Sequence, residues 1–422
     1  MNGLKNEFVC PEVLAPAGDM ERLCCALDFG ADAVYLAGKS FGMRTSPGNF
    51  SDEELETAVK MCHERNVKVY LTCNTVSTND EIDHLPEFLK TAEKAGVDAL
   101  IISDIGAFSM AKKYAPNTQI HVSTQAGIMN YQTANAFYEM GASRVVLARE
   151  MSLEDIRVLR DKTPPELEIE CFVHGAMCVS FSGRCLLSNY LVGRDSNRGD
   201  CAQPCRWKYH LMEDTRPGQY FPVEQNEEGT FIMNARDMCM IEHIPELVDA
   251  GITSFKIEGR AKSAYYTAVV TNAYRAAVDE YVRCDDKSNF VLSDWIKEEM
   301  RKVSYREYCT GFYFSSPLDD AQIYYEGGYR REWDVVAVTD RCENGRLFAV
   351  QRNRFFEGDV LEVLQPGEKP FKITAVDLKN EDGENVPAAN KAMMKLSFKT
   401  DEQVAPGAIL RKERDEPERV IV

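Results

Sequence analysis

The sequence lacks any run of about 18 apolar residues, so we expect no membrane-spanning helix. It also lacks an excess of positive charge, because 67 Asp and Glu stand against 49 Lys and Arg, for a formal net charge of −18. This balance excludes a general nucleic-acid coat protein, so any nucleic-acid contact must use a local basic patch. The opening residues, MNGLKNEFVCPEVL, lack the apolar segment of a secretory signal, and we expect a cytoplasmic location.

The sequence also lacks an H-E-x-x-H motif, which excludes a zinc peptidase site of that type. Cysteine, by contrast, is plentiful, with 14 residues among 422. Disulfides are disfavoured in the cytoplasm, so most of these cysteines should be small buried hydrophobic residues. A tight cluster of them would instead indicate a metal site or catalysis.

The first part of the chain alternates short apolar strands with amphipathic helices. The predicted strands end near Ala17, Ala37, Cys73, Ser103, Thr124, Ala148, Val173 and Ile257. Left-handed glycines are predicted to end four of the helices, at Gly30, Gly96, Gly141 and Gly251. Eight such units favour an α/β fold with a (β/α)8 TIM-like barrel. An open doubly wound sheet is the alternative, because a sequence does not show whether the sheet closes.

The chain is divided into three predicted parts. Residues 1–284 form the barrel, with a cysteine-rich insertion at 174–253 that follows a barrel strand, where such barrels build their active sites. Residues 285–330 form a helical and aromatic-rich linker. Residues 331–422 contain short alternating runs, such as WDVVAVTD and RLFAVQR, and predict a small C-terminal antiparallel β-barrel domain.

Four cysteines in the insertion follow a C-x6-C-x15-C-x3-C spacing, at Cys178, Cys185, Cys201 and Cys205. Thiolates suit iron–sulfur clusters or zinc, and this spacing does not match the tight knuckles of common zinc fingers. Structural zinc and four unrelated core cysteines are the alternatives. Cys239 follows an extra strand near the same rim and is the one further thiol considered as a ligand.

The residues around the first two of these cysteines carry a longer pattern, E-x-F-x2-G-[SA]-x-C-x4-G-x-C-x-x-S. It is made by Glu170, Phe172, Gly175, Cys178, Gly183, Cys185 and Ser188. This pattern, the opening PEVLAPAGDMERL and the later SFKIEGRAKSAYYTAVV resemble the collagenase-like peptidase family over nearly the whole chain.

The resemblance implies hydroxylation and not the peptidase activity that the family's name states. The family includes proteins that hydroxylate wobble uridine of tRNA to 5-hydroxyuridine without oxygen, with prephenate as the implied oxygen source. Others hydroxylate ribosomal RNA or a quinone precursor. In these members the corresponding cysteines hold a 4Fe–4S cluster, which implies the same four ligands here. The AQPCRWKY run and the two-domain length look most like the members that modify tRNA.

An oxygen-donating dicarboxylate such as prephenate requires basic side chains, because Arg pairs bidentately with carboxylates. Charged candidates near the predicted strand ends are Lys39, Arg149, Glu150, Lys256, Glu258 and Arg260. Arg149 and Glu150 are assigned to catalysis together with His174, which could relay a proton. Ion pairs that brace the rim, and a structural histidine, are the alternatives.

An RNA surface is predicted on residues 176–210, which hold five Lys and Arg against two Asp. Arg184 and Arg206 are the predicted substrate-binding residues of this loop. Trp207, Tyr190 and Tyr209 interleave with them and could stack on the bases of the tRNA anticodon region. A solvated loop whose aromatic residues cover the cluster is the alternative.

Two other classes of function remain open. A collagenase-like peptidase would use His174 and Cys178 as a catalytic pair, but a thiolate bound to iron is not free to attack a carbonyl. A non-catalytic subunit would need a paralogous partner protein for its chemistry.

Overall fold

The computed structural model describes residues 10–42, 48–177, 185, 187–194, 196, 200–204, 224–226, 229–231, 234–314, 322–323 and 329–420. No helix within these ranges is long and apolar enough to cross a membrane.

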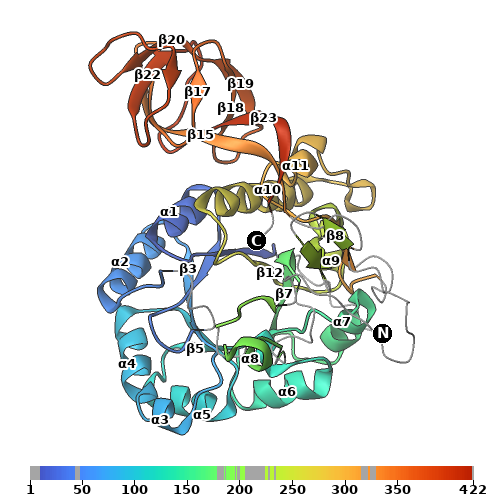
Figure 1. Ribbon diagram of the computed structural model, residues 1–422. Helices are drawn as coiled ribbons and strands as arrows, with labels where there is room; N and C mark the ends of the chain where they lie inside the picture. The colour runs from blue at the N-terminus through green and yellow to red at the C-terminus, as the bar shows by residue number, and fades with distance from the viewer. Residues whose placement is uncertain are drawn as a thin grey trace.

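Eight parallel strands form the barrel in Figure 1. They are β1 (Glu12–Pro16), β2 (Ala33–Leu36), β3 (Lys68–Cys73), β4 (Ala99–Ile102), β5 (Gln119–Val122), β6 (Arg144–Val146), β7 (Glu168–Ala176) and β12 (Ser254–Ile257). The sheet closes because β12 pairs with both β1 and β7, with Phe255 opposite Val13 on one side and Cys171 on the other. The predicted TIM-like barrel is confirmed, and the open doubly wound sheet is wrong.

Helices surround this barrel (Figure 1). They are α1 (Met20–Asp28), α2 (Asp52–His63), α3 (Asn79–Ile82), α4 (Leu85–Ala95), α5 (Ile105–Tyr114), α6 (Tyr131–Glu139), α7 (Leu153–Asp161), α9 (Ile244–Asp249) and α10 (Ala264–Arg283). The glycines predicted to follow four of them all have positive φ, between 79° and 103°. Each glycine thus stops a helix at little steric cost before the next buried strand begins.

The predicted insertion, residues 174–253, is described only in part. Strand β7 continues into it as far as Ala176, and β11 (Asp237–Cys239) pairs antiparallel with this extension. Strand β13 (Tyr308–Cys309) adds a further parallel strand beside β11. The insertion also contains α8 (Leu187–Val192), β8 (Glu224–Asn226), β9 (Gly229–Phe231) and β10 (Asn234–Ala235), and β10 pairs antiparallel with β14 (Gln322–Ile323), which lies outside it.

The C-terminal domain is a seven-stranded antiparallel sheet. Its order is β19 (Phe371–Thr374), β18 (Val360–Leu364), β23 (Ile409–Val420), β15 (Tyr329–Glu343), β16 (Arg346–Gln351), β22 (Lys395–Lys399) and β20 (Val376–Asn380), and β17 (Phe355–Phe356) pairs separately with β21 (Ala388–Ala389). The predicted antiparallel domain is confirmed as a half-barrel, because the described pairings do not join the edge strands β19 and β20.

A buried ion network holds the two domains together. Arg411 of β23 contacts Glu299, the last residue of α11 (Asp294–Glu299), at 2.6 Å from Nη2 to Oε1. Its Nε donates to Glu362 of β18 at 2.8 Å, and Lys302 contacts the same carboxylate at 2.8 Å. Arg411 and Glu299 are fully buried, so the position of the C-terminal domain depends on these pairs being complete.

Candidate active site at the mouth of the barrel

A cavity of about 1100 Å³ lies at the carboxyl ends of the barrel strands. Residues from seven strands or their C-terminal ends line it, namely Tyr35, Thr72, Ile101, Ser123, Arg149, Phe172 and Lys256. Leu187 of α8 lines the same space, in agreement with the position of α8 over the barrel in Figure 1. This is the end at which (β/α)8 barrels carry out chemistry.

The local backbone brings β7 and β12 together at this cavity. Gly175 has φ +108°, and a Cβ atom there would lie 2.5 Å from the carbonyl oxygen of Glu258. The register of β7 against β12 shifts at Ile257, so the chain after β12 passes close to Gly175. Only glycine permits this approach, which explains its place in the cysteine motif.

Arg149 lies over the ring of Phe172, with its guanidinium carbon 3.8 Å from the ring centroid. Its Nη1 donates to the carbonyl oxygen of Ala176 at 2.8 Å, and its Nη2 lies 3.6 Å from Oε2 of Glu258. Its Nε is buried and has no hydrogen-bond partner among the described residues. The guanidinium is therefore held in one orientation at the cavity.

Two further cations line the cavity from β12 and the residues after it. Lys256 contacts the buried carboxylate of Glu170 at 2.6 Å and lies 4.5 Å from the ring centroid of Tyr35. Arg260 is almost fully buried and donates to Oγ1 of Thr72 and Oδ1 of Asn49, both at 3.1 Å. With Arg149, these residues give the cavity three fixed positive side chains.

Two of the four predicted cluster cysteines, Cys185 and Cys201, line this same cavity. Sγ of Cys201 accepts a hydrogen bond from the backbone N–H of Gln203 at 3.3 Å. The other two, Cys178 and Cys205, lie outside the described residues, as do the predicted RNA contacts Arg184 and Arg206. The two described cysteines of the predicted cluster thus share one cavity with the basic residues Arg149, Lys256 and Arg260.

Cys239, considered as a fifth thiol, does not line the cavity. It lies on β11 opposite His174, and burial raises the pKa of its thiol to about 12. A thiol held in its protonated form is a poor metal ligand, so the placement favours a packing role.

His174, predicted as a proton relay, lies away from the cavity. Its ring is enclosed by Tyr266, Tyr274 and Tyr308, with centroids 5.3 to 6.0 Å away. Burial lowers the pKa of His174 to about 3, so the imidazole is neutral near pH 7. This environment favours the structural interpretation, because a general base works best with a pKa near the operating pH.

Two more predicted site residues do not line the cavity. Lys39 is exposed beyond β2, and Glu150 follows Arg149 without facing the same space. The acidic residue that meets Arg149 is Glu258, which also lines the cavity. The ion pair of Arg149 therefore joins the end of β6 to the end of β12, and it does not join Arg149 to its sequence neighbour Glu150.

Residues Gly38–Gly42 read Gly-Lys-Ser-Phe-Gly and match the letters of a serine-hydrolase elbow. Such an elbow is a sharp turn from a strand directly into a helix. Here β2 ends at Leu36 and the next described helix begins at Asp52. Ser40 is exposed and does not line the cavity, so the match carries no catalytic geometry.

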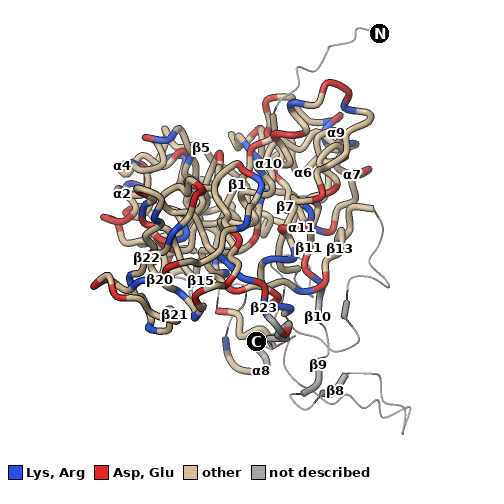
Figure 2. Tube along the Cα trace, turned by 90° about the horizontal axis from the view of Figure 1, so that it is seen from above, with Lys and Arg blue, Asp and Glu red and all other residues tan. Residues whose placement is uncertain are grey.

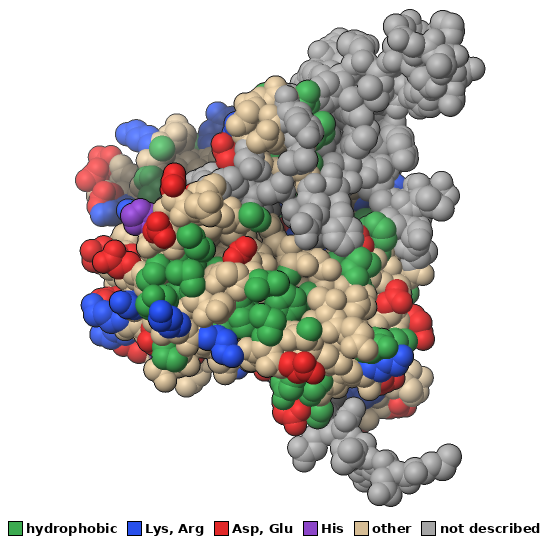
Figure 3. Space-filling model, turned by 90° about the horizontal axis from the view of Figure 1, so that it is seen from below, with side chains coloured by type: hydrophobic (Ala, Val, Ile, Leu, Met, Phe, Trp, Pro, Cys, Tyr) green, Lys and Arg blue, Asp and Glu red, His purple; other side chains and the backbone are tan. Residues whose placement is uncertain are grey.

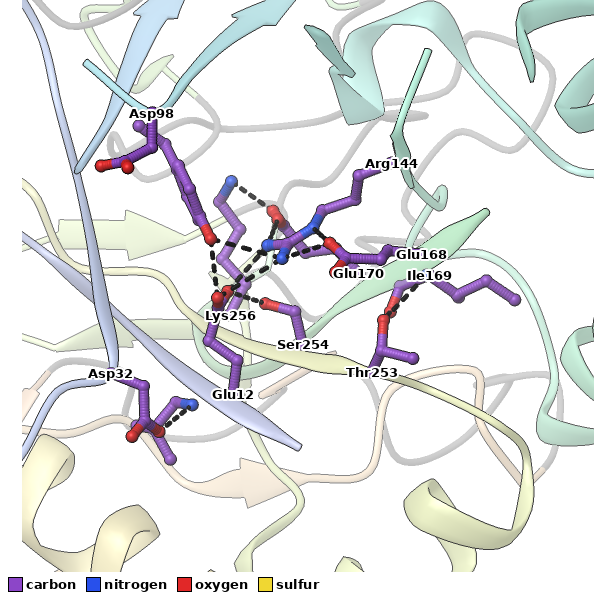
Figure 4. Close-up of polar contacts among 12 residues, drawn as sticks. Glu12, Asp32, Asp98, Arg144, Glu168, Ile169, Glu170, Thr253, Ser254 and Lys256 are labelled. Carbon is purple, nitrogen blue, oxygen red and sulfur yellow. Dashed lines mark hydrogen bonds and ion pairs between the residues drawn. The ribbon is translucent and has the colours of Figure 1, made fainter. Parts of the chain in front are cut away.

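A charged network fills the barrel beneath the cavity, with Arg144 at its centre (Figure 4), and no motif in the sequence marks this arginine. Arg144 Nη1 lies 2.7 Å from Oε1 of Glu12 and 3.1 Å from Oε2 of Glu170. Its Nε donates to Glu168 at 2.7 Å, and the hydroxyl of Tyr70 donates to Glu12 at 2.6 Å. Because Glu170 also holds Lys256, the network fixes one of the three cavity cations from below.

Arg144→Met is expected to lower the free energy of unfolding by about 3–5 kcal/mol, because it leaves Glu12 without its counter-charge and buried Glu170 with Lys256 alone. Arg65→Ala is the control, since its half-exposed pair with Asp28 is worth less than about 1 kcal/mol. Urea denaturation measures both. Equal losses in the two variants would contradict a stabilising role for the network.

The pH dependence of stability should report the burial of His174. The pKa of His174 in the folded protein, about 3, lies below the ordinary histidine pKa of 6.5, so its contribution to stability is complete above pH 6.5 and is lost as the pH falls towards 3. Between pH 7 and pH 4.5 wild type should lose about 3 kcal/mol more than His174→Phe, at about 1.4 kcal/mol per pH unit. Urea titrations at the two pH values measure this, and equal losses would contradict the buried neutral state.

Most of the chain matches the sequence patterns of one protein family. The pattern of peptidase family U32 matches residues 18–323, and that of the peptidase family U32 C-terminal domain matches residues 331–411. The chain is 37% identical over 415 residues to tRNA hydroxylation protein P1 of Bacillus subtilis, covering 98% of this chain and 97% of the relative. It is 33% identical to tRNA hydroxylation protein P of Escherichia coli, covering 90% and 91%.

A further relative carries the family's other name. The chain is 33% identical over 339 residues to a collagenase of Porphyromonas gingivalis, covering 78% of each chain. Relatives named for hydroxylation and for proteolysis thus match this chain at similar identity, but the match to the collagenase covers less of the chain. The chain belongs to peptidase family U32.

Proposed function

We propose that this protein hydroxylates tRNA, converting wobble uridine to 5-hydroxyuridine without oxygen and with prephenate as co-substrate. The observation that carries the proposal is the common cavity of Cys185, Cys201 and three basic side chains. Two relatives named tRNA hydroxylation proteins, which match along 98% and 90% of the chain, support hydroxylation of tRNA. A cytoplasmic location belongs to the proposal, since tRNA is the substrate.

A 4Fe–4S cluster is part of this proposal, and the donor chemistry fits it as far as the described residues reach. Cys185 and Cys201 present thiols at one cavity, and thiolates are the usual ligands of such clusters. Within the described ranges, no group of three or more His, Cys, Asp or Glu is placed to hold a metal ion. Cys185 and Cys201 would therefore need Cys178 and Cys205 to complete the set, and the bound cluster would supply electron transfer.

The basic residues of the cavity suit a small dicarboxylate. Arg149 offers a guanidinium fixed by Ala176 and Glu258, and Lys256 offers an ammonium held by Glu170 at the cavity floor. Prephenate carries two carboxylates, which these two cations can bind at separate points. Glu258 fixes Arg149 from the opposite strand end, so the guanidinium needs little reordering when the ligand binds.

Proteolysis gains less support from the site. A cysteine peptidase needs an imidazole of pKa near 7 beside the thiol, whereas His174 is buried with a pKa of about 3. The relative named collagenase is the reason to measure peptidase activity in parallel.

The test is an oxygen-free incubation of the iron-loaded protein with unmodified tRNA and prephenate, followed by mass analysis of the nucleosides. We expect 5-hydroxyuridine that depends on prephenate. Iron-loaded protein that degrades collagen peptides and leaves uridine unchanged would contradict the proposal.

A further inference from the structure

The cavity does not end at the mouth of the barrel but continues between the two domains. Lys262, Tyr329, Arg331, Trp333, Arg352 and Asn353 line this continuation, which we call the interdomain groove. Lys262 comes from the segment between β12 and α10, and the others come from β15 and from β16 and the residues after it. A ligand in the groove would therefore reach Arg149 and Lys256 without leaving the cavity.

The groove and cavity together are basic in an acidic protein. Their lining includes seven Lys and Arg but three Asp and Glu, whereas the whole chain has a net charge of −18. Figure 2 shows Lys and Arg interspersed with Asp and Glu along most of the described trace, and Figure 3 shows both signs on the face seen from below. The basic surplus is thus local, as recognition of a polyanion by an acidic protein requires.

The basic side chains of the groove can exchange partners at low cost. Arg331 contacts Asp334 at 2.8 Å and Arg352 contacts Glu21 at 3.7 Å, and both arginine side chains are more than a third exposed. Lys262 lies 3.9 Å from the ring centroid of Tyr329 and forms no ion pair with a described acidic residue. Exposed pairs of this kind are worth about 0–1 kcal/mol, so phosphate oxygens can replace the carboxylates.

An aromatic residue lies among these cations. Trp333 is half-buried and lines the groove, with Lys302 and Arg411 at 4.9 and 5.5 Å from its ring centroid. Both cations belong to the buried network that joins the domains, so the indole is held in place before any ligand binds. A fixed aromatic face beside partly exposed basic side chains is the arrangement that binds single-stranded nucleic acid.

We propose that the interdomain groove binds the single-stranded anticodon loop of tRNA, an inference that rests on the proposed function. Phosphates lie along Lys262, Arg331 and Arg352, an unstacked base contacts Trp333, and the target uridine enters the cavity at the barrel mouth. The C-terminal domain thus selects an RNA loop, while the barrel holds the small anion and carries out the chemistry.

The test measures tRNA affinity of the full-length protein by fluorescence anisotropy over a range of salt concentrations. Arg331→Gln combined with Arg352→Gln should weaken binding at least tenfold at about 0.1 M salt and reduce the slope of log affinity against log salt by about two. Arg341→Gln, on the same strand but outside the groove, should bind like wild type. Trp333→Leu should weaken binding with no change in that slope, since it removes stacking and no charge.

The outcomes separate the groove from the proposed function. Wild type that hydroxylates tRNA, alongside a double variant with unchanged affinity and salt slope, would overturn the groove and leave the function standing. Wild type that neither binds nor hydroxylates tRNA would overturn both. Unchanged tRNA affinity with lost binding of a protein partner would assign the groove to that partner and overturn the inference.

Discussion

Replacing Cys201 by alanine should remove iron and acid-labile sulfide together and reduce tRNA hydroxylation to background. Cys201 lines the cavity with Cys185, and a cubane cluster needs one thiolate for each iron. Loss of a single cysteine ligand is expected to destabilise the whole cluster. Among the described residues, no group of three or more His, Cys, Asp or Glu is placed to hold a metal ion in its stead. Iron and sulfide analysis, followed by nucleoside mass analysis, measures both effects.

Cys239→Ala is the matched control for this variant. Its thiol is buried on β11, has a pKa raised to about 12 by that burial, and does not line the cavity. We expect it to keep full iron and full hydroxylation. Loss of iron from Cys239→Ala, with retention by Cys201→Ala, would show that the ligand set is wrong.

Replacing Arg149 by alanine should raise KM for prephenate or lower kcat/KM by about 10- to 150-fold. The estimate corresponds to about 1.5–3 kcal/mol for hydrogen bonds to a charged group. Arg149 is fixed by Ala176, Glu258 and the Phe172 ring, so its guanidinium meets the ligand with little loss of side-chain freedom. Steady-state kinetics at several prephenate concentrations measure the change.

Two further variants separate ligand binding from folding. Arg149→Lys keeps the charge but loses the planar fork, so it should recover only part of the activity. Arg157→Ala removes an arginine of α7 whose pair with Asp249 lies outside the cavity, and it should behave like wild type. If Arg149→Ala retains normal kinetics for prephenate, the anion pocket is placed wrongly.

The barrel could be predicted because its signals are local. Buried strands read as short β-branched runs, and glycine marks the helix ends, as the positive φ values of Gly30 and Gly141 bear out. The same strand boundaries predict the positions of Arg149, Lys256 and Arg260, since the carboxyl ends of parallel strands meet at one face of the barrel. The half-barrel domain was found in the same way from alternating runs.

Other features depend on contacts between distant segments. Strand β23 lies between β15 and β18, and its Arg411 contacts Glu299 and Glu362, which are 112 and 49 residues away in the sequence. Arg144 lies in an ordinary apolar strand, and only the closed barrel brings it to Glu12, 132 residues away. Alternation within β7 was a usable signal, since Glu168, Glu170 and Phe172 share one face of the strand. The sequence left a proton relay and a structural histidine both open at His174, because the aromatic residues around its ring come from the distant α10 and β13.

The most direct test of hydroxylation uses a strain from which every gene of this family has been removed. The strain carries wild-type protein, Cys201→Ala or no protein, and its tRNA nucleosides are analysed by mass spectrometry. We predict that wild-type protein restores wobble 5-hydroxyuridine and its derivatives, whereas Cys201→Ala and the empty strain do not. Soluble, iron-loaded wild-type protein that leaves these nucleosides absent, or equal restoration by Cys201→Ala, would contradict the iron–sulfur hydroxylation proposed here.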